Sequence, residues 1–342
     1  MKVLVTGAFG FVGAALCRHL ADDGHEVFAL ARGADRDPPD TRVRVVRGDV
    51  TSADDVDAAV TDMHAVFHLA AVISYSSSDR AKMFHVNVGG TRLVALACIK
   101  HGCRMIHCSS MASCGFNWRA SDAVRNEQST YNLAGYALGY CESKLASERV
   151  VLELHKEKDL DVVIVNPCNV YGSGDATKSS RQTQVKVARG RMPFYPQGGV
   201  NVVHVDDVCN GVVLAWRKGA SGQRYLLGGD NITIKAMFEV IASTAGATPP
   251  RWPLFVFLQL ALGRLGLVPL EKVVPANMFC WFSSAKAESE LGYRHRPAAE
   301  ALRESTRWMM ANSPNDASHG KSAQVVTAAV VLLAVACAIY FN

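Results

Sequence analysis

The chain has 342 residues, of which 49% are hydrophobic and 20% charged, and its formal net charge is +5 at pH 7. This balance excludes a disordered or fibrous protein and predicts one large α/β unit or two fused domains. The charge is too small and too evenly spread to indicate a nucleic-acid partner, and ten irregularly spaced cysteines without an N-terminal signal peptide favour a reducing compartment.

The first half of the chain alternates short apolar runs with longer helical patterns. The runs are nearly continuous, as expected for strands that are buried on both faces of a parallel sheet. The predicted strands are 3–6, 27–30, 43–46, 65–69, 105–108 and 162–165, and the predicted helices are 11–23, 54–61, 80–101 and 135–158. This rhythm predicts an α/β fold with a Rossmann-type, doubly wound parallel sheet over residues 1–170.

The pattern changes after residue 170. Residues 171–199 are rich in Gly, Ser, Arg and Pro, and a predicted strand (200–205), helix (208–218), strand (223–227) and helix (233–245) follow. We expect a small α/β cap that binds the substrate over residues 171–310, with the elements at 200–220 returning to the first domain.

Two apolar stretches lie near the C-terminus. Residues 323–341 contain no charge, Pro or Gly, and at ~1.5 Å per residue a helix there would cross a bilayer core of ~30 Å. The sequence therefore predicts a linker at 311–322 and a C-terminal transmembrane helix at 323–341, with the catalytic domain facing the cytosol, at the endoplasmic reticulum in a eukaryote. The stretch 253–270 is interrupted by Arg264 and two glycines, and we expect it to meet an apolar substrate or a membrane surface, with a buried cap helix as the alternative.

A glycine-rich loop follows the first predicted strand and opens the first predicted helix. In the loop, Gly7 permits a tight turn, Gly10 lets backbone N–H groups approach a pyrophosphate, and Gly13 lets helix and strand pack closely. Its place in the first strand–helix turn predicts dinucleotide binding. The expected cofactor-binding residues of the loop are Gly7, Phe9, Gly10, Phe11, Val12 and Gly13.

The GxxGxxG spacing is one of several ordered motifs in the chain. The others include His68-Leu69-Ala70-Ala71, Asn87-Val88-Gly89-Gly90-Thr91, Cys108-Ser109-Ser110, Tyr140-Cys141-Glu142-Ser143-Lys144 and Asn166-Pro167-Cys168-Asn169-Val170-Tyr171-Gly172. On these motifs the chain resembles the extended short-chain dehydrogenases/reductases of the NAD-dependent epimerase/dehydratase superfamily, from residue 1 to about residue 310. Within that superfamily it is most similar to the dihydroflavonol reductase and 3β-hydroxysteroid dehydrogenase branch.

This resemblance implies further roles. Asp49 and Val50 would contact the adenine, and Asn87 would support the catalytic lysine. The small segment Leu69, Ala70 and Ala71 would line the path of the cofactor, and the backbone after Pro167, as far as Val170, would meet the nicotinamide carboxamide. Helix pairing into a homodimer is common in the family and stays open for this chain.

The end of the second predicted strand bears on which nicotinamide is bound. NAD-selective folds carry an acidic residue there, which holds the ribose 2′-hydroxyl. Here Ala31 is apolar and Arg32 follows it, and a guanidinium suits a phosphate. We therefore expect NADP(H), with NAD(H) as the alternative; a solvated Arg32 that stacks on the adenine also stays open.

Tyr140 and Lys144 are four residues apart in a predicted helix and therefore share one face. A nearby ammonium group favours the phenolate form of a tyrosine, whose reference pKa is about 10. Ser110 follows the fifth predicted strand, at the sheet edge where ligands bind in open α/β folds. We expect Ser110, Tyr140 and Lys144 to be catalytic. Tyr140 is chosen over Tyr131 and Tyr136 because neither of those has a lysine four residues later.

Two functions fit these residues. The first is an NADP(H)-dependent oxidoreductase that interconverts a ketone and a secondary alcohol on an apolar sterol-, lipid- or polyphenol-like substrate, with Tyr140 as acid and base. The alternative is a nucleotide-sugar epimerase or dehydratase with tightly bound NAD(P), for which a basic pocket would be needed. Its candidates are Lys178, Arg181, Lys186, Arg189 and Arg191. No metal is expected, because the Cys and His residues at 98–108 lack paired metal-ligand spacing.

Overall fold

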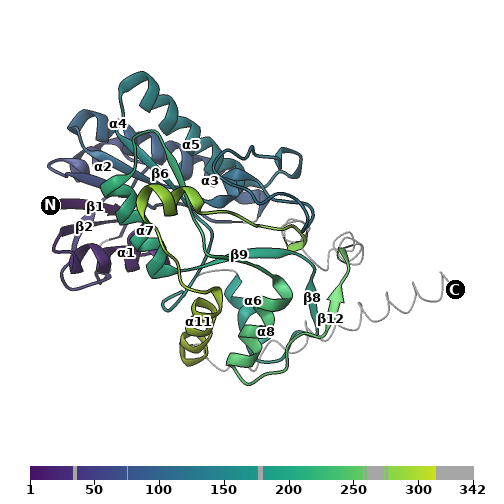
Figure 1. Cartoon of the computed structure of the whole chain (residues 1–342). Coiled ribbons are helices and arrows are strands. Elements are labelled where there is room, and N and C mark those ends of the chain that lie inside the picture. Colours follow the sequence, from purple (N-terminus) through teal and green to yellow (C-terminus); the bar gives the residue numbers. More distant parts are fainter. Residues whose placement is uncertain are drawn as a thin grey trace.

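The computed structural model describes residues 1–33, 37–74, 76–175, 180–256, 259, 273 and 276–312. Its main feature is a seven-stranded parallel sheet in the order β10-β6-β5-β4-β1-β2-β3 (Figure 1). The strands are β1 (Lys2–Thr6), β2 (Glu26–Ala31), β3 (Arg44–Arg47), β4 (Ala65–His68), β5 (Arg104–Cys108), β6 (Val162–Pro167) and β10 (Arg224–Leu227). The prediction of a Rossmann-type α/β fold is confirmed.

Helices cover both faces of this sheet. Val3 and Val5 of β1 pack in one apolar cluster with residues of α1 (Phe11–Asp22) and α7 (Val205–Lys218). Leu4 belongs to a second cluster on the other face, which is covered by helices α2, α4 and α5. These helices are α2 (Ala53–Val60), α4 (Thr91–His101) and α5 (Gly139–Lys158). Apolar side chains are therefore favoured on both faces of the central strands, which is why their sequences do not alternate.

Two of the predicted helices differ in detail. The helix expected at 80–101 is split into α3 (Arg80–Phe84), a π-helical turn η2 (His85–Gly90) and α4. The helix expected at 135–158 begins only at Gly139, because Ala137 has a left-handed backbone with φ of 50°. The short 3-10 turns are η1 (Ser77–Asp79), η3 (Met111–Cys114) and η4 (Ala134–Tyr136).

The C-terminal part forms a smaller α/β unit. Its strands are β7 (Asn169–Tyr171), β9 (Gly199–His204) and β11 (Asp230–Thr233) in one sheet, and β8 (Phe194–Pro196) and β12 (Trp252–Leu254) in another. Its helices are α6 (Ser180–Ala188), α8 (Ile234–Thr244) and α11 (Ala298–Asn312), and the π-helical turn η5 is Ala287–Leu291. Figure 1 shows α6, α8 and α11 gathered on one side of β9, away from β1 and β2.

The sequence predicted that elements at 200–220 return to the first domain, but not which strands each unit takes. Helix α7 covers the main sheet, but β9 before it pairs with β7 and β11, and β10 after it is the edge strand beside β6. The loop after β5 also reaches the cap, because Asn117 and Arg125 form β-bridges with Phe279 and Phe282. Residues 117–125 therefore join the main unit to the cap.

The predicted fold class included a C-terminal transmembrane helix, and this part of it is corrected. Within residues 1–312, apart from the gaps given above, no helix is both long enough and apolar enough to cross a membrane. Helix α5 has 20 residues, but it is amphipathic and carries Glu, Lys and Arg side chains along its length. The segment 323–341 and most of the stretch 253–270 lie outside the described residues.

Candidate active site

The glycine loop connects β1 directly to α1. Gly7 has a left-handed backbone with φ of 69°, and its carbonyl accepts a hydrogen bond from the N–H of Gly10 at 3.0 Å. A Cβ on Gly7 would lie 2.7 Å from the backbone of Leu69 and Ala70, and a Cβ on Gly13 would lie 2.1 Å from the carbonyl oxygen of Gly7. The loop is thus pressed against the ends of β1 and β4, where no side chain fits.

The start of α1 is left open for an anion. Gly10 is the N-cap residue and offers no side chain to the first backbone N–H groups, and the first turn contains no acidic residue. Helix N-termini with uncapped N–H groups attract phosphate through those groups and the helix dipole. Phe11 and Val12 in this first turn are half-buried and pack on the core. These features fit a dinucleotide pyrophosphate.

The residues expected at the adenine end lie beyond β2 and β3. Asp49 accepts hydrogen bonds from the backbone N–H and the hydroxyl of Thr51 at 2.9 and 2.8 Å. Burial would raise the pKa of Asp49, but the hydrogen bonds from Thr51 and the charge of Arg32 outweigh it and lower that pKa. Arg32 itself is exposed just after β2, so the guanidinium is accessible beside a carboxylate that stays ionised.

Asn87 lies in the π-helical turn η2 and is buried. Its Oδ1 accepts a hydrogen bond from the N–H of Val72 at 2.7 Å, and its Nδ2 donates to the carbonyl of Val72 at 3.0 Å and the hydroxyl of Ser143 at 2.9 Å. The side chain therefore joins the segment after Leu69, Ala70 and Ala71 to the turn of α5 that carries Lys144. This bracing agrees with the supporting role that the resemblance implies.

Ser110 begins the turn η3 directly after β5. Its hydroxyl accepts a hydrogen bond from the N–H of Ala112 at 3.2 Å, and its backbone is extended, with φ of −160°. Its carbonyl oxygen accepts hydrogen bonds from the N–H of Ser113 at 3.1 Å and from Nδ2 of Asn166 at 3.0 Å. The serine is thus held at both its backbone and its side chain.

Lys144 is buried with only 4% of its surface exposed, and its Nζ donates a hydrogen bond to the carbonyl of Cys108 at 2.8 Å. Burial lowers the pKa of Lys144, and nearby Cys108 and Glu148 oppose that effect. Tyr140 is one turn earlier on the same helix, and α5 packs against η3. The structure therefore brings the faces that carry Tyr140 and Lys144 to the carboxyl end of β5, next to Ser110.

Two buried histidines support this end of the sheet. His68 lies between the hydroxyls of Thr6 and Thr91 at 2.8 and 3.0 Å, and its ring stacks on that of His107 with 5.7 Å between centroids. Burial and the charge of Lys144 lower the pKa of His68 to about 3, so this histidine is neutral. It serves as a polar bridge from β1 to α4 rather than as a titrating group.

Pro167 and Val170 lie on different sheets. Pro167 ends β6 in the main sheet, whereas Val170 lies in β7 and pairs with Val203 of the cap. The backbone expected to meet the nicotinamide is therefore the point at which the chain passes from the main sheet to the cap. The roles of the individual residues stay predictions.

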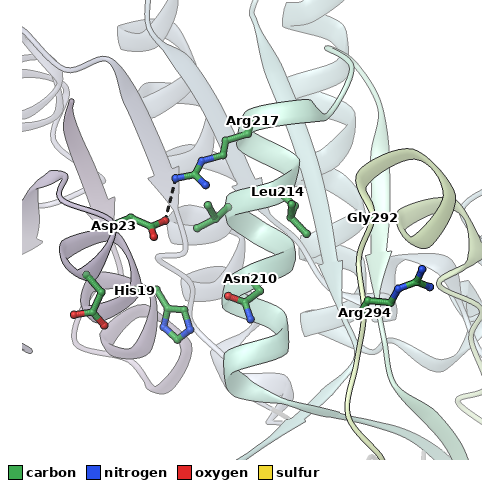
Figure 2. Close-up of a pocket in the computed structure, with 9 residues that line it drawn as sticks. His19, Asp23, Asn210, Leu214, Arg217, Gly292 and Arg294 are labelled. Atoms are coloured by element: carbon green, nitrogen blue, oxygen red, sulfur yellow. Dashed lines mark hydrogen bonds and ion pairs between the residues drawn. The ribbon is translucent and has the colours of Figure 1, made fainter.

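A separate hollow of about 420 Å³ lies between the C-terminal half of α1, the middle of α7 and the segment after η5. Figure 2 shows His19 and Asp23 on one side and Asn210, Leu214 and Arg217 on the other, with Arg217 paired to Asp23 at 3.0 Å. None of the predicted site residues lines it. Among the described residues, no group of three or more His, Cys, Asp or Glu side chains is arranged to hold a metal.

Three residues near Ser110 were not predicted as site residues: Ser113 and Asn166 contact its carbonyl oxygen, and Glu148 contacts both of them. Asn166 and Glu148 contact each other at 2.6 Å although they lie 18 residues apart on β6 and α5. One signal was present: Glu148 follows Lys144 by four residues, as Lys144 follows Tyr140, so all three share one helical face.

A parallel sheet with a glycine loop in its first strand–helix turn, and with serine, tyrosine and lysine at the carboxyl end of β5, defines a nucleotide-dependent enzyme of the Rossmann class. The model of the NAD dependent epimerase/dehydratase family matches residues 3–228. A protein of Synechocystis sp. that is provisionally named dihydroflavonol 4-reductase is 31% identical over 326 residues, which cover 89% of this chain and 93% of that protein.

Two further similarities extend over most of the chain. The 3 beta-hydroxysteroid dehydrogenase/Delta 5-->4-isomerase of Mycobacterium tuberculosis is 30% identical over 327 residues, which cover 85% of each protein. The crystal structure of gox2253 is similar with a TM-score of 0.81 and 32% identity, over 91% of this chain and 98% of that one. The chain belongs to the NAD-dependent epimerase/dehydratase family, and the prediction of an NAD(P)-dependent enzyme is confirmed.

Proposed function

We propose that the protein is an NADP(H)-dependent oxidoreductase that interconverts a ketone and a secondary alcohol on an apolar substrate. The observation that carries this proposal is the position of Lys144, which lies one helical turn after Tyr140. Its buried ammonium group donates a hydrogen bond to the carbonyl of Cys108, and Cys108 lies two residues before Ser110. This supports the proposal, because the carboxyl end of β5 then offers a hydroxyl that can hold a substrate oxygen, with a phenol that can move a proton on the adjoining helix α5.

The chemistry of these residues follows from their positions. When bound, the nicotinamide supplies or accepts a hydride. In the direction of reduction, the Ser110 hydroxyl donates a hydrogen bond to the carbonyl oxygen, and Tyr140 gives its phenolic proton to that oxygen. The Lys144 ammonium stabilises the phenolate that remains. In the direction of oxidation, the phenolate takes the hydroxyl proton back.

The surroundings of these groups favour an apolar substrate. Buried Met111 and Cys141 directly follow Ser110 and Tyr140 in the chain, and the buried thiol of Cys114 lies four residues after Ser110. Burial raises the pKa of Cys114 to about 11 and that of Cys141 to about 12, so both thiols are neutral near pH 7. The names of the relatives, a dihydroflavonol reductase and a steroid dehydrogenase, support the same class of substrate.

The substitution Arg32→Ala tests the cofactor preference. A charge-assisted hydrogen bond is worth ~1.5–3 kcal/mol, so we expect the KM for NADPH to rise by roughly 10- to 100-fold, with little change for NADH. Arg44→Ala is the matched control, because Arg44 begins β3, pairs with Glu26 and is equally exposed to solvent. Equal effects on both cofactors would contradict a role of Arg32 in binding the 2′-phosphate.

The reaction is tested with the full chain by following NADPH absorbance. The probes are two ketones, the apolar sterol-like cholestanone and the polyphenol dihydroquercetin, and two nucleotide sugars, UDP-glucose and dTDP-glucose. Consumption of NADPH with a ketone is the expected result. If a nucleotide sugar is converted without net loss of cofactor and neither ketone reacts, the proposal is wrong and the chain is an epimerase or dehydratase.

A further inference from the structure

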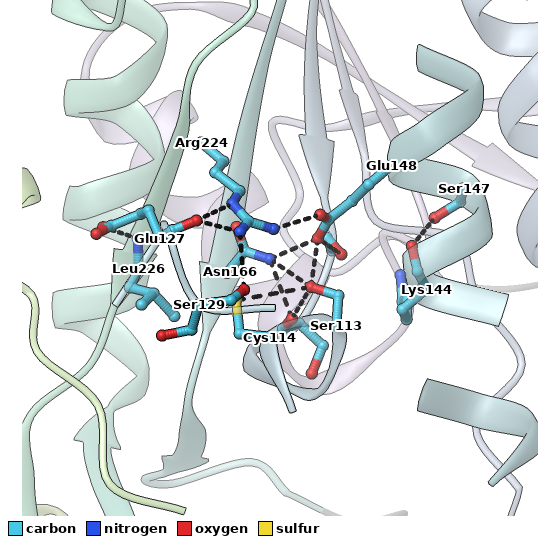
Figure 3. A network of polar contacts seen from close by, with 12 residues as sticks. Ser113, Cys114, Glu127, Ser129, Lys144, Ser147, Glu148, Asn166, Arg224 and Leu226 are labelled. Carbon is cyan, nitrogen blue, oxygen red and sulfur yellow. Dashed lines mark hydrogen bonds and ion pairs between the residues drawn. The ribbon is translucent and has the colours of Figure 1, made fainter. Parts of the chain in front are cut away.

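A buried carboxylate lies behind the catalytic serine. Glu148 is 1% exposed and projects from α5 toward the end of β6 (Figure 3). Its Oε1 accepts a hydrogen bond from Nδ2 of Asn166 at 2.6 Å and lies 2.6 Å from the hydroxyl of Ser113, and the Ser109 hydroxyl also donates to it. A single carboxylate oxygen is thus hydrogen-bonded to side chains from β6 and from the segment directly after β5.

The same groups contact the backbone of Ser110. Nδ2 of Asn166 donates to the carbonyl oxygen of Ser110 at 3.0 Å, and the hydroxyl of Ser113 lies 2.8 Å from that oxygen. Ser113 has a single hydroxyl proton for the two acceptors, Ser110 and Glu148, and Asn166 supplies a further contact to Ser113 at 3.0 Å. The carboxylate therefore reaches Ser110 through two bridging side chains.

The charge of Glu148 is balanced from the other side. Nη1 of Arg224 on β10 donates to Oε2 at 3.2 Å, and Nε of Arg224 donates to the carbonyl of Glu127 at 2.7 Å. Removing one partner of a buried ion pair destabilises a protein, whereas replacing the whole pair with apolar residues is often neutral. Stability alone therefore does not explain why a carboxylate is buried at this position. A better explanation is that it holds the donor groups of Ser109, Ser113 and Asn166 in place.

Glu148 also faces the catalytic lysine. It is one helical turn after Lys144, and its negative charge helps to keep the buried ammonium group protonated. The positive charge of Lys144 is what stabilises the phenolate of Tyr140.

We propose that Glu148 is a positioning residue of the active site: held by Arg224, it fixes Ser113 and Asn166, and through them it fixes the backbone and the hydroxyl direction of Ser110. This proposal rests on the proposed function, because it assumes that Ser110 holds the substrate oxygen. It assigns Glu148 no contact with substrate or cofactor.

The test is Glu148→Gln in the full chain, with cholestanone and dihydroquercetin as probes. Gln keeps the size of the side chain but removes the charge and one acceptor. Loss of supporting partners around an active site typically lowers activity by 10- to 100-fold, and we expect about that fall in kcat. The KM and Kd for NADPH should stay within about twofold, because none of the contacts of Glu148 involves the glycine loop.

The matched control is Glu153→Gln, which makes the same change at an exposed position of the same helix and should leave kcat unchanged. Ser113→Ala is a second variant that removes one bridge and leaves Glu148 paired with Arg224. It should also lower kcat, but by a smaller factor. Unlike Glu148→Gln, it leaves no buried charge of Arg224 without its carboxylate partner.

Hydrogen exchange gives a readout that needs no substrate. The N–H of Ala112 and that of Ser113 bond to the hydroxyl and the carbonyl of Ser110, so both should exchange at least about tenfold faster in Glu148→Gln, while β5 and α5 keep their protection. A variant with a lower Tm but unchanged kcat and unchanged exchange in η3 would overturn the proposal. If the wild type reduces neither ketone, the proposed function fails, and the exchange data still decide whether Glu148 positions Ser110.

Discussion

Tyr140→Phe is expected to lower kcat by about 100- to 10,000-fold, which is the usual range for loss of a positioned general acid or base. The change removes a single oxygen atom and keeps the ring, which is partly buried and packs on the apolar core. Binding of NADPH should therefore stay within about twofold, and the Tm should hardly change. Stopped-flow absorbance at saturating NADPH separates this loss of the chemical step from a loss of binding.

The control for this prediction is Tyr136→Phe. Tyr136 precedes Tyr140 by four residues and is 42% exposed. Its ring lies against that of Trp118 with 5.3 Å between centroids and a tilt of 46°, a contact that phenylalanine keeps. It has no lysine one turn further on. A large loss of kcat in Tyr136→Phe, with full activity in Tyr140→Phe, would mean that the acid–base group has been assigned to the wrong tyrosine.

The elements of the Rossmann unit could be predicted because local sequence determines them. The central strands are buried by helices on both faces, so a continuous apolar run such as Val3 to Val5 marks a strand without knowledge of its neighbours. The glycine loop could be predicted for a similar reason, since Gly7 has a left-handed backbone and a Cβ on Gly13 would meet the backbone of Gly7 in the same turn. The close approach of Gly7 to Leu69 and Ala70, by contrast, depends on residues that are distant in sequence.

Other features depend on residues that are distant in sequence. The main sheet takes β10 as its last strand because Tyr225 and Leu226 pair with Val165 and Asn166, and no local pattern distinguishes this from a strand of the cap. Likewise, Glu148 gains its role only when β5, β6 and β10 bring Ser109, Asn166 and Arg224 to it. Serine, asparagine and arginine are ordinary surface residues when read one at a time.

The π-helical turn within the region 80–101 is an intermediate case. The sequence shows a single helical pattern there, but Asn87 lies in a π-helical turn whose wider spacing lets the amide face the segment after β4. Such turns are rare and often occur at functional sites. Asn87 could be singled out from its motif, whereas the distortion that aims its side chain could not.

Gly13→Ala is the second change with a large expected effect. A Cβ at this position would meet the carbonyl oxygen of Gly7 at 2.1 Å and Cα of Ala8 at 2.9 Å, and both belong to the backbone and cannot rotate away. Helix α1 must therefore move off β1, and the N–H groups of its first turn move with it. In the proposed cofactor site those groups would give the pyrophosphate several charge-assisted hydrogen bonds of ~1.5–3 kcal/mol each, so we expect the Kd for NADPH to rise at least about 100-fold.

The same shift should destabilise the fold, since overpacking at a close contact costs about 1–3 kcal/mol. Fluorescence titration with NADPH and thermal unfolding of the same preparation separate loss of the cofactor site from loss of folded protein. Gly135→Ala is the matched control, because a Cβ there meets nothing within 4 Å and the residue has no left-handed backbone. A Gly13→Ala variant that binds NADPH with wild-type affinity would show that the pyrophosphate does not lie at the start of α1, and the cofactor site would then have to be sought elsewhere along the carboxyl edge of the sheet.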